Sequence, residues 1–268
     1  KKIILTNILL IFCVICFTAQ AQTPAPADPA WRVGTLPNGM KYYIRNNAKP
    51  AGKACFWIAH NIGALHETHN QNGLAHFLEH MAFNGLKNFP GKAMLEYMQS
   101  IGCSFGANIN ASTGQTLTQY LLTDVPISRE GVIDTCLLIL HDWSGNILCK
   151  PEELDAERGV IREEWRTGSN AMRRNSEEMG RTLYSGTPYA TRTVIGDTSI
   201  INNFTQKDIL DFYHDWYRPN LQAIVVVGDF DINMMENKVK NLFSSLNNPE
   251  NEKVKAEFNV PDNIEPIT

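Results

Sequence analysis

Extended runs and helical stretches alternate along this chain in an order that limits the possible folds more than any other feature. Strands are expected at 31–36, 40–45, 54–60, 117–123 and 223–227. The first two flank Pro37-Asn38-Gly39, and Asn-Gly between extended runs is a strong hairpin signal. Helical periodicity is found at 74–84, 92–101, 130–143, 151–167, 205–216 and 232–246. This order predicts an α+β fold, with helices packed on one face of a mostly antiparallel sheet.

The first 21 residues differ in composition from the rest of the chain. Lys1 and Lys2 precede an apolar run, and Ala19-Gln20-Ala21 has the small-x-small pattern of a signal-peptidase site. The run is short for a membrane span and no charged residue follows it directly. We therefore expect residues 1–21 to be a secretory signal peptide, with no stable membrane anchor after cleavage. The protein is expected to be exported, either to a periplasm or out of the cell.

The remaining sequence divides into three parts. Residues 22–30 form a Pro/Ala-rich linker. The strand and helix patterns then fill residues 31–248, which we expect to be one domain. Residues 249–268 are polar, and we expect them to be a linker or the start of a following domain, so that the chain is truncated there.

Charge and cysteine content exclude two kinds of function. The formal net charge is −4 and no basic stripe occurs, so nucleic acid is not an expected partner. The cysteines show no CxxC spacing after the predicted cleavage site, which argues against a cysteine zinc site. The sequence leaves open whether disulfides form among Cys55, Cys103, Cys136 and Cys149.

A candidate metal site lies in residues 74–84, LAHFLEHMAFN. His76 and His80 are spaced i, i+4 and so lie one turn apart on one side of the predicted helix. Two imidazoles at this spacing can share a zinc ion. Glu79 is too close in sequence to be a natural third ligand, but it is well placed to accept a proton from a water activated by zinc. His-x-x-Glu-His is the signature of the inverzincin peptidases.

A third ligand is expected from the acidic helix at 151–167. Glu157 and Glu164 are seven residues apart, which places them on the same side of a helix. Glu164 is the preferred ligand. Glu157 is expected to contact a ligand and not the metal, and so to orient that ligand or tune the site. Glu163, which points about 100° away, is the alternative.

Several separated stretches resemble the pitrilysin (M16) family of zinc metallopeptidases, from about Trp31 to Leu246. They are LPNGMKYYIR, GLAHFLEHMAFNG, ERGVIREEW, TPYATRTVIGD and FYHDWYRPNLQAIVVVGDFD. The combination of MAFNG, FPGK and EEWR resembles the bacterial exported PqqL-like subfamily.

This resemblance implies one zinc ion per chain, bound by two histidines and a glutamate, with the motif glutamate as base. Carried over, the ligands are His76, His80 and Glu164, and the base is Glu79. Glu157 matches the family's auxiliary glutamate, which favours Glu164 over Glu163.

The resemblance also implies that substrate peptides bind as an extended strand at a sheet edge. Residues 107–113 resemble the family's Asn-Ala-x-Thr segment there, which makes Asn110, Ala111 and Thr113 candidate substrate-binding residues. An ordinary polar turn is the other interpretation of this segment.

The expected function is that of a zinc-dependent endopeptidase that hydrolyses extended peptides. Active members of the family need a second homologous half, so we expect such a half on the same chain or on another subunit. The alternative is a non-catalytic subunit that binds peptides or serves as a scaffold in an M16-type complex. The intact His-x-x-Glu-His motif and the position of Glu164 argue against that alternative. The sequence does not indicate the natural substrate, the cleavage preference or the oligomeric state.

Overall fold

The computed structural model describes residues 28–261. The expected signal peptide and most of the expected linker lie outside the described residues, and the domain boundaries stay predictions. Of the described residues, 31–261 belong to one compact unit. Among the described helices, none has the length and apolar character needed to cross a membrane.

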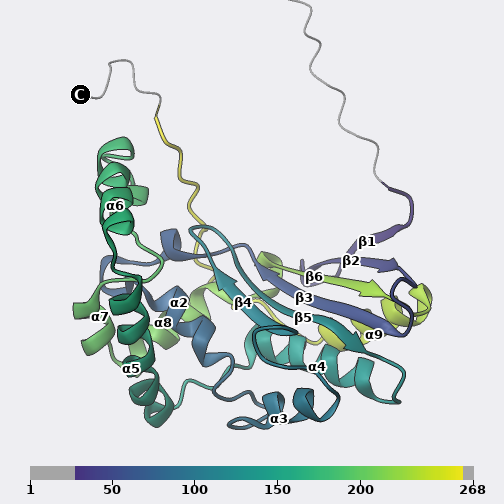
Figure 1. The fold of residues 1–268 in the computed structure, drawn as a ribbon. Helices are drawn as coiled ribbons and strands as arrows, with labels where there is room; N and C mark the ends of the chain where they lie inside the picture. Colours follow the sequence, from purple (N-terminus) through teal and green to yellow (C-terminus); the bar gives the residue numbers. More distant parts are fainter. Residues whose placement is uncertain (1–27, 262–268) are drawn as a thin grey trace, which may run out of the picture. The chain divides into compact units, whose positions relative to one another are not determined.

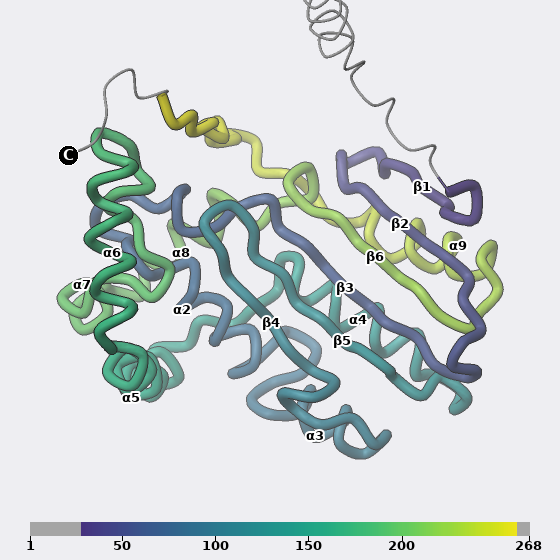
Figure 2. The backbone as a smooth tube through the Cα atoms, turned by 45° about the horizontal axis from the view of Figure 1, so that its top comes forward, coloured from purple at the N-terminus to yellow at the C-terminus, as the bar shows by residue number. Residues whose placement is uncertain are grey.

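A six-stranded sheet lies at the centre of this unit, with the strand order β1-β2-β6-β3-β5-β4 (Figures 1 and 2). Neighbouring strands are antiparallel except for β2 and β6, which are parallel. The strands are β1 (Trp31–Thr35), β2 (Lys41–Asn46), β3 (Lys53–His60), β4 (Ile109–Thr113), β5 (Thr118–Pro126) and β6 (Gln222–Gly228). This confirms the predicted α+β fold and its mostly antiparallel sheet.

Helices cover one face of the sheet and gather at one end of it. In Figure 1, α4 and α9 lie below the sheet, while α2, α5, α6, α7 and α8 group beyond β4. The helices are α2 (Leu74–Met81), α3 (Ala93–Ser100), α4 (Val132–Gly145), α5 (Pro151–Gly168), α6 (Ala171–Leu183), α7 (Thr198–Asn203), α8 (Gln206–Trp216) and α9 (Ile232–Phe243). Short 3-10 turns occur at Ala64–His66, His69–Gln71, Pro188–Ala190 and Pro219–Leu221.

The alternation of side chains along the strands explains why one face is covered. In β6, Ile224 and Val226 are fully buried, whereas Val225 and Val227, which alternate with them, are half-buried. In β3, Trp57 points to the other face and is 37% exposed. Successive side chains of a strand point to opposite faces, so the helices pack on the face that carries the fully buried residues.

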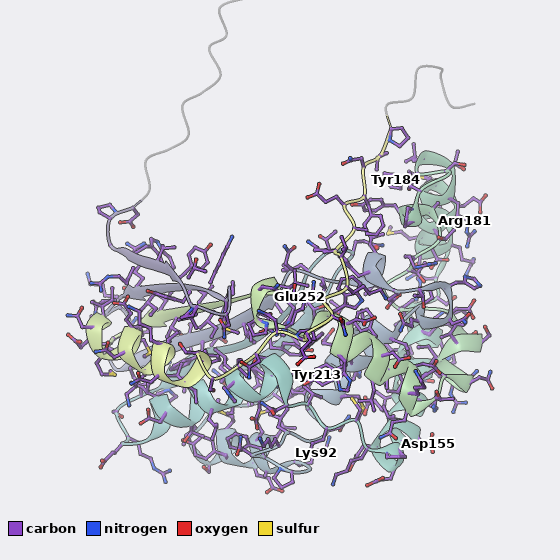
Figure 3. All side chains as sticks on the ribbon, turned by 180° about the vertical axis from the view of Figure 1, so that it is seen from behind. Lys92, Asp155, Arg181, Tyr184, Tyr213 and Glu252 are labelled. Carbon is purple, nitrogen blue, oxygen red and sulfur yellow. The ribbon has the colours of Figure 1, made fainter. Side chains whose placement is uncertain are left out.

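Three elements were not predicted from the sequence: β4, α6 and the short helix α7. The strand β4 is short and polar, INAST, and so lacks the apolar alternation that marks a half-buried strand. The helix α6 has no buried residue, and Met172 on it is 79% exposed. Arg181 and Tyr184 lie at its projecting end, as Figure 3 shows from behind. The apolar side chains of such a helix point to solvent, so its sequence does not show which side packs against the core.

The four cysteines of the described chain are free thiols. Cys103, Cys136 and Cys149 are buried and Cys55 is half-buried. They pack as small apolar side chains, as their apolar sequence surroundings indicate.

A charged cluster joins the N-terminal hairpin to α9 and predicts an effect of pH. Glu236 accepts hydrogen bonds from Lys240 (2.8 Å), from the hydroxyl of Tyr42 (2.7 Å) and from Arg32. These bonds lower the pKa of Glu236 from 4.5 to about 2. The stabilisation is thus present above pH 4.5 and is lost as the pH falls toward 2.

We therefore expect Glu236→Gln to flatten the loss of stability over this acidic range. Urea unfolding at a series of pH values, with the exposed-site variant Glu250→Gln as control, measures the free energy of unfolding. If the wild type and Glu236→Gln lose stability in parallel below pH 4.5, the cluster does not contribute as described.

Candidate metal centre

The helix α2 presents its polar side chains to one place because its apolar side chains are fixed in the core. The side chains of Leu74, Phe77, Leu78 and Met81 are completely buried. His76, Glu79 and His80 therefore lie on the side of the helix that faces α5 and β4.

The N-terminus of α2 is held by a carboxylate from outside the helix. Glu67 accepts hydrogen bonds from the backbone N–H groups of Ala75 (2.8 Å) and Gly73 (3.0 Å). These donors have no partner within the helix, and a carboxylate there also interacts favourably with the helix dipole. The segment Ile62–Glu67 is buried, whereas His69 just after it is exposed.

A close backbone contact also fixes this end of α2. Gly73 has φ +104°, and a Cβ added to it would lie 2.7 Å from the Cα of Gly196. Asp197 donates its backbone N–H to the carbonyl of Asn72 (3.3 Å). The loop before α7 therefore packs directly against the start of the metal-site helix.

The helix α5 begins at Pro151 and packs through its buried side chains Leu154 and Ile161. Because Glu157 and Glu164 each lie three residues after one of these, both carboxylates project along the same side of α5 toward α2.

Arg158 attaches α5 to the C-terminal part of α7 and to the residue that follows it. Its guanidinium donates to the carbonyls of Ile201 (2.5 Å) and Phe204 (2.7 Å) and stacks over the Phe204 ring at 4.0 Å. The Phe204 ring in turn meets the edge of Phe77 on α2, with centroids 4.7 Å apart. The two helices that carry the candidate ligands are thus connected through packed side chains.

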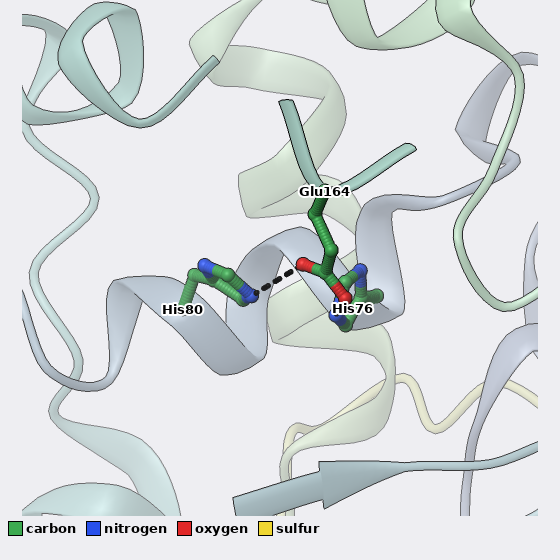
Figure 4. Close-up of side chains that lie close together, drawn as sticks. All are labelled: His76, His80 and Glu164. Carbon is green, nitrogen blue, oxygen red and sulfur yellow. Dashed lines mark ion pairs between the residues drawn. The ribbon is translucent and has the colours of Figure 1, made fainter. Parts of the chain in front are cut away.

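His76, His80 and Glu164 come together as one cluster (Figure 4). His80 Nε2 lies 3.5 Å from Glu164 Oε2, and His76 Nε2 lies 3.7 Å from Glu164 Oε1. Donor atoms that share a tetrahedral zinc ion lie about 3.4 Å apart, given zinc–ligand distances of about 2.0–2.2 Å. The three side chains therefore fit zinc. Within residues 28–261 this is the one group of three histidine, cysteine or acidic side chains close enough to share an ion.

Glu163, the alternative third ligand, does not join the cluster. Its carboxylate accepts two hydrogen bonds from Arg166, at 2.6 and 2.8 Å, on the exposed side of α5. The structure places Glu164, and not Glu163, beside the two histidines.

The two histidines differ in how they are supported. His80 Nδ1 lies 2.8 Å from Glu157 Oε1, so a proton on Nδ1 leaves the lone pair of Nε2 facing the cluster. Burial lowers the pKa of His80, but the hydrogen bond to Glu157 and the nearby carboxylate charges outweigh it and raise the pKa overall. For His76, burial and the charge of His80 lower the pKa to about 4. Its imidazole is therefore neutral near pH 7, as a metal ligand must be.

Glu79 lies beside the cluster and is oriented by the edge strand. Its Oε2 accepts a hydrogen bond of 2.6 Å from the hydroxyl of Thr113. Burial raises the pKa of Glu79, while the Thr113 hydrogen bond and the charge of His80 oppose that rise. A carboxylate with a raised pKa is suited to both accepting and returning a proton near neutral pH.

The three candidate substrate-binding residues lie on β4 and not in a polar turn. Asn110 is exposed and Ala111 is half-buried on this edge strand. Thr113 is engaged with Glu79, which gives its side chain a role that was not expected. Beside β4, a hollow of about 290 Å³ reaches Glu79 and His80. Its apolar lining consists of Phe83, Leu95, Phe105, Ala111 and Val160.

Sequence reasoning missed the side chains that support this cluster. Asn84 donates to Glu157 Oε2 (2.7 Å), and Lys92 donates to Asn84. Polar residues at such positions have many possible partners, and no spacing rule marks them.

Comparisons with known proteins identify the family of the chain. Residues 42–195 match the family described as "Insulinase (Peptidase family M16)", and residues 203–267 match the "Peptidase M16 inactive domain". The chain is 33% identical to the probable zinc protease PqqL of Haemophilus influenzae, over 94% of this chain and 28% of that protein. It is 36% identical to the probable zinc protease PqqL of Escherichia coli, over 77% of this chain and 22% of that protein.

A solved structure shares the fold. The crystal structure of the first half of the periplasmic protease PqqL from Escherichia coli matches with a TM-score of 0.82 and 32% identity, covering 91% of this chain and 51% of that one. The chain spans about a quarter of the length of the curated relatives it matches. On the family match, the relatives and the shared fold, this chain belongs to peptidase family M16 and is PqqL-like within it.

Proposed function

We propose that the protein containing this chain is a zinc-dependent endopeptidase that cleaves peptides bound in an extended form. The observation that carries the proposal is the convergence of His76, His80 and Glu164 beside a buried, oriented Glu79. The names of the relatives, zinc proteases, agree with this chemistry.

In the proposed mechanism His76, His80 and Glu164 hold one zinc ion per chain. When bound, zinc supplies a Lewis acid that polarises a peptide carbonyl and lowers the pKa of a water molecule. Glu79 acts as the base: Thr113 holds its Oε2, which leaves Oε1 to accept the proton from the attacking water. The same oxygen then returns the proton to the departing amine.

The edge strand β4 supplies the site for the peptide backbone. Within the described residues β4 pairs with no strand other than β5, and an isolated bridge to Phe105 involves only its first residue, Ile109. The rest of its other edge carries backbone groups that can pair with an extended peptide. Asn110 and Ala111 would lie along that peptide, and the neighbouring apolar hollow would take an apolar side chain next to the cleaved bond.

Complete activity is proposed to need more of the protein than this chain. The E. coli PqqL structure that contains both halves is about four times as long as the matched region, since the chain covers 26% of it. We propose that a second M16-like half, on the same chain or another subunit, encloses the substrate. Export to the periplasm is proposed from the N-terminal sequence and from the description of E. coli PqqL as periplasmic.

The non-catalytic alternative predicts a different outcome for the same site. A scaffold or peptide-binding subunit needs neither a metal ion nor a base, yet this chain keeps a set of donors at zinc-compatible distances with Glu79 beside it. A full-length protein that binds peptides but cleaves none, with zinc supplied, would favour that alternative.

The first experiment is a measurement of zinc content by mass spectrometry and of zinc affinity by competition with a chelator. We expect about one zinc ion per chain in the wild type. Glu164→Gln should weaken zinc binding by more than about 10-fold, since it removes a ligand and even supporting residues contribute about 10- to 100-fold. Glu163→Gln is the matched control and should leave the affinity unchanged, because Glu163 pairs with Arg166. The reverse pattern would assign the third ligand to Glu163.

A further inference from the structure

A chain of hydrogen bonds leads from the surface to the metal cluster through residues that the proposed mechanism does not use. Glu157 engages both of its oxygens: Oε1 contacts His80 Nδ1 at 2.8 Å, and Oε2 accepts from Asn84 Nδ2 at 2.7 Å. Asn84 Oδ1 in turn accepts from Lys92 Nζ. Asn84 and Lys92 belong to the MAFNG and FPGK stretches of the sequence.

We propose that Asn84 and Lys92 are positioning residues that hold the His80 ring in place through Glu157, and that this relay determines how tightly the protein binds zinc. The inference rests on the proposed function, because it takes His76, His80 and Glu164 as the zinc ligands. It adds two residues outside that set.

The chemistry of the groups allows only one order of donors in this relay. An ammonium group can only donate and an ionised carboxylate can only accept, whereas an amide has one edge of each kind. Asn84 can therefore lie between Lys92 and Glu157 only with its oxygen toward the lysine and its nitrogen toward the glutamate. The amide is fixed in one orientation, and so is the carboxylate that it contacts.

Burial raises the cost of losing the hydrogen bond between Asn84 and Glu157. Asn84 is 7% exposed, and Glu157 is also largely shielded from water. Removal of the Asn84 side chain would leave one Glu157 oxygen without its donor, and the carboxylate would be free to turn away from His80. Asn84 Nδ2 also lies 3.3 Å from the backbone carbonyl of His80, which ties the amide to the helix that carries the ligand.

Lys92, which is exposed, donates to the same amide from the solvent side. Besides Asn84, its Nζ lies 3.4 Å from the backbone carbonyl of Phe83, just past the C-terminus of α2. A positive charge is favourable at the end of a helix, where carbonyl groups lack helical partners. Lys92 therefore holds both the amide and the end of the metal-site helix.

Within the described part of the chain, His76 has no comparable hydrogen bond to support its ring. Its Nδ1 is buried and has no hydrogen-bond partner among the described residues. The imidazole that depends on hydrogen-bonded support is thus His80, and the relay is the contact that orients it.

The test is zinc affinity, measured on the full-length protein by competition with a chromophoric chelator and without substrate. We expect Asn84→Leu to weaken zinc binding by about 10- to 100-fold, the range typical of residues that support a metal ligand. Lys92→Met should weaken it by a smaller factor, up to about 10-fold. Lys87→Met, at an exposed lysine of the same loop, is the matched control and should have no effect.

A double-mutant comparison separates a relay from a general loss of structure. If Asn84 acts through Glu157, then Asn84→Leu combined with Glu157→Gln should bind zinc about as tightly as Glu157→Gln alone. Fully additive losses would overturn the relay. The visible absorption of cobalt bound in place of zinc gives a second readout, and its spectrum should change in Asn84→Leu and not in Lys87→Met.

The outcomes also distinguish this inference from the proposed function. A wild type that binds zinc tightly while Asn84→Leu and Lys92→Met bind it equally well would overturn the inference alone. A wild type that binds no zinc would overturn the proposed function, and the inference with it. If Asn84→Leu does not fold, the surface variant Lys92→Met decides, and an unchanged affinity in it counts against the relay.

Discussion

Glu79→Gln in the full-length protein is expected to lower kcat/KM for peptide cleavage by at least about 100-fold while one zinc ion per chain remains bound. The proposed base would lose its ability to accept a proton, and positioned general bases contribute about 10²- to 10⁴-fold. Glutamine keeps the size of the side chain and an oxygen that can still accept from Thr113. The ligands and the packing of α2 are unchanged, so zinc content should stay the same. Cleavage of a mixture of fluorescence-quenched peptides, measured beside metal content, checks both parts.

The matched control for this substitution is Glu163→Gln, which makes the same chemical change on the exposed side of α5. It should retain both activity and zinc. Retention of near wild-type cleavage by Glu79→Gln would remove Glu79 from the role of base. A joint loss of cleavage and zinc would mean that Glu79 supports the metal rather than the proton transfer.

His76→Ala is expected to weaken zinc binding by more than about 100-fold, with loss of peptide cleavage. It removes one of the three proposed protein ligands, and residues that merely support a ligand already contribute about 10- to 100-fold. The fold should survive, because the four apolar side chains that anchor α2 are untouched. Chelator competition gives the affinity, and circular dichroism of the metal-free protein shows whether the helices remain.

His69→Ala serves as the control, since it removes an exposed imidazole from the segment just before α2. Its zinc affinity should equal that of the wild type. If His76→Ala bound zinc as tightly as His69→Ala does, then the cluster in Figure 4 would not be the metal site.

The parts of this molecule that follow a periodic rule could be predicted from the sequence. The i, i+4 spacing of His76 and His80 places both rings on one side of α2 whatever the helix packs against. The seven-residue spacing of Glu157 and Glu164 does the same on α5. The short apolar runs at 54–60 and 223–227 predict strands, and the structure contains β3 and β6 at these places.

The parts that depend on distant contacts could not be predicted in the same way. The hydrogen bond from Thr113 to Glu79 joins residues from two elements that no local pattern relates. Glu67 begins a polar stretch of sequence, yet its side chain is buried because the free N–H groups of α2 donate to its carboxylate. In α6 the apolar side chains face outward, so periodicity alone could not show where the helix packs.

The strand order has a consequence for how this chain reaches its folded state. β6 lies between β2 and β3, although it begins at Gln222, long after β2 has ended at Asn46. Until that strand has been synthesised, the hairpin β1–β2 and the three strands β3, β5 and β4 have no hydrogen bonds to each other, and each presents a bare edge. Sheets closed by such distant pairings form slowly, and exposed edges invite aggregation in the meantime. The helix that carries the histidines packs beside β4, in a sheet whose inner strand β6 is the last to be made. The sheet next to the site is therefore completed by a segment that contributes no ligand to it.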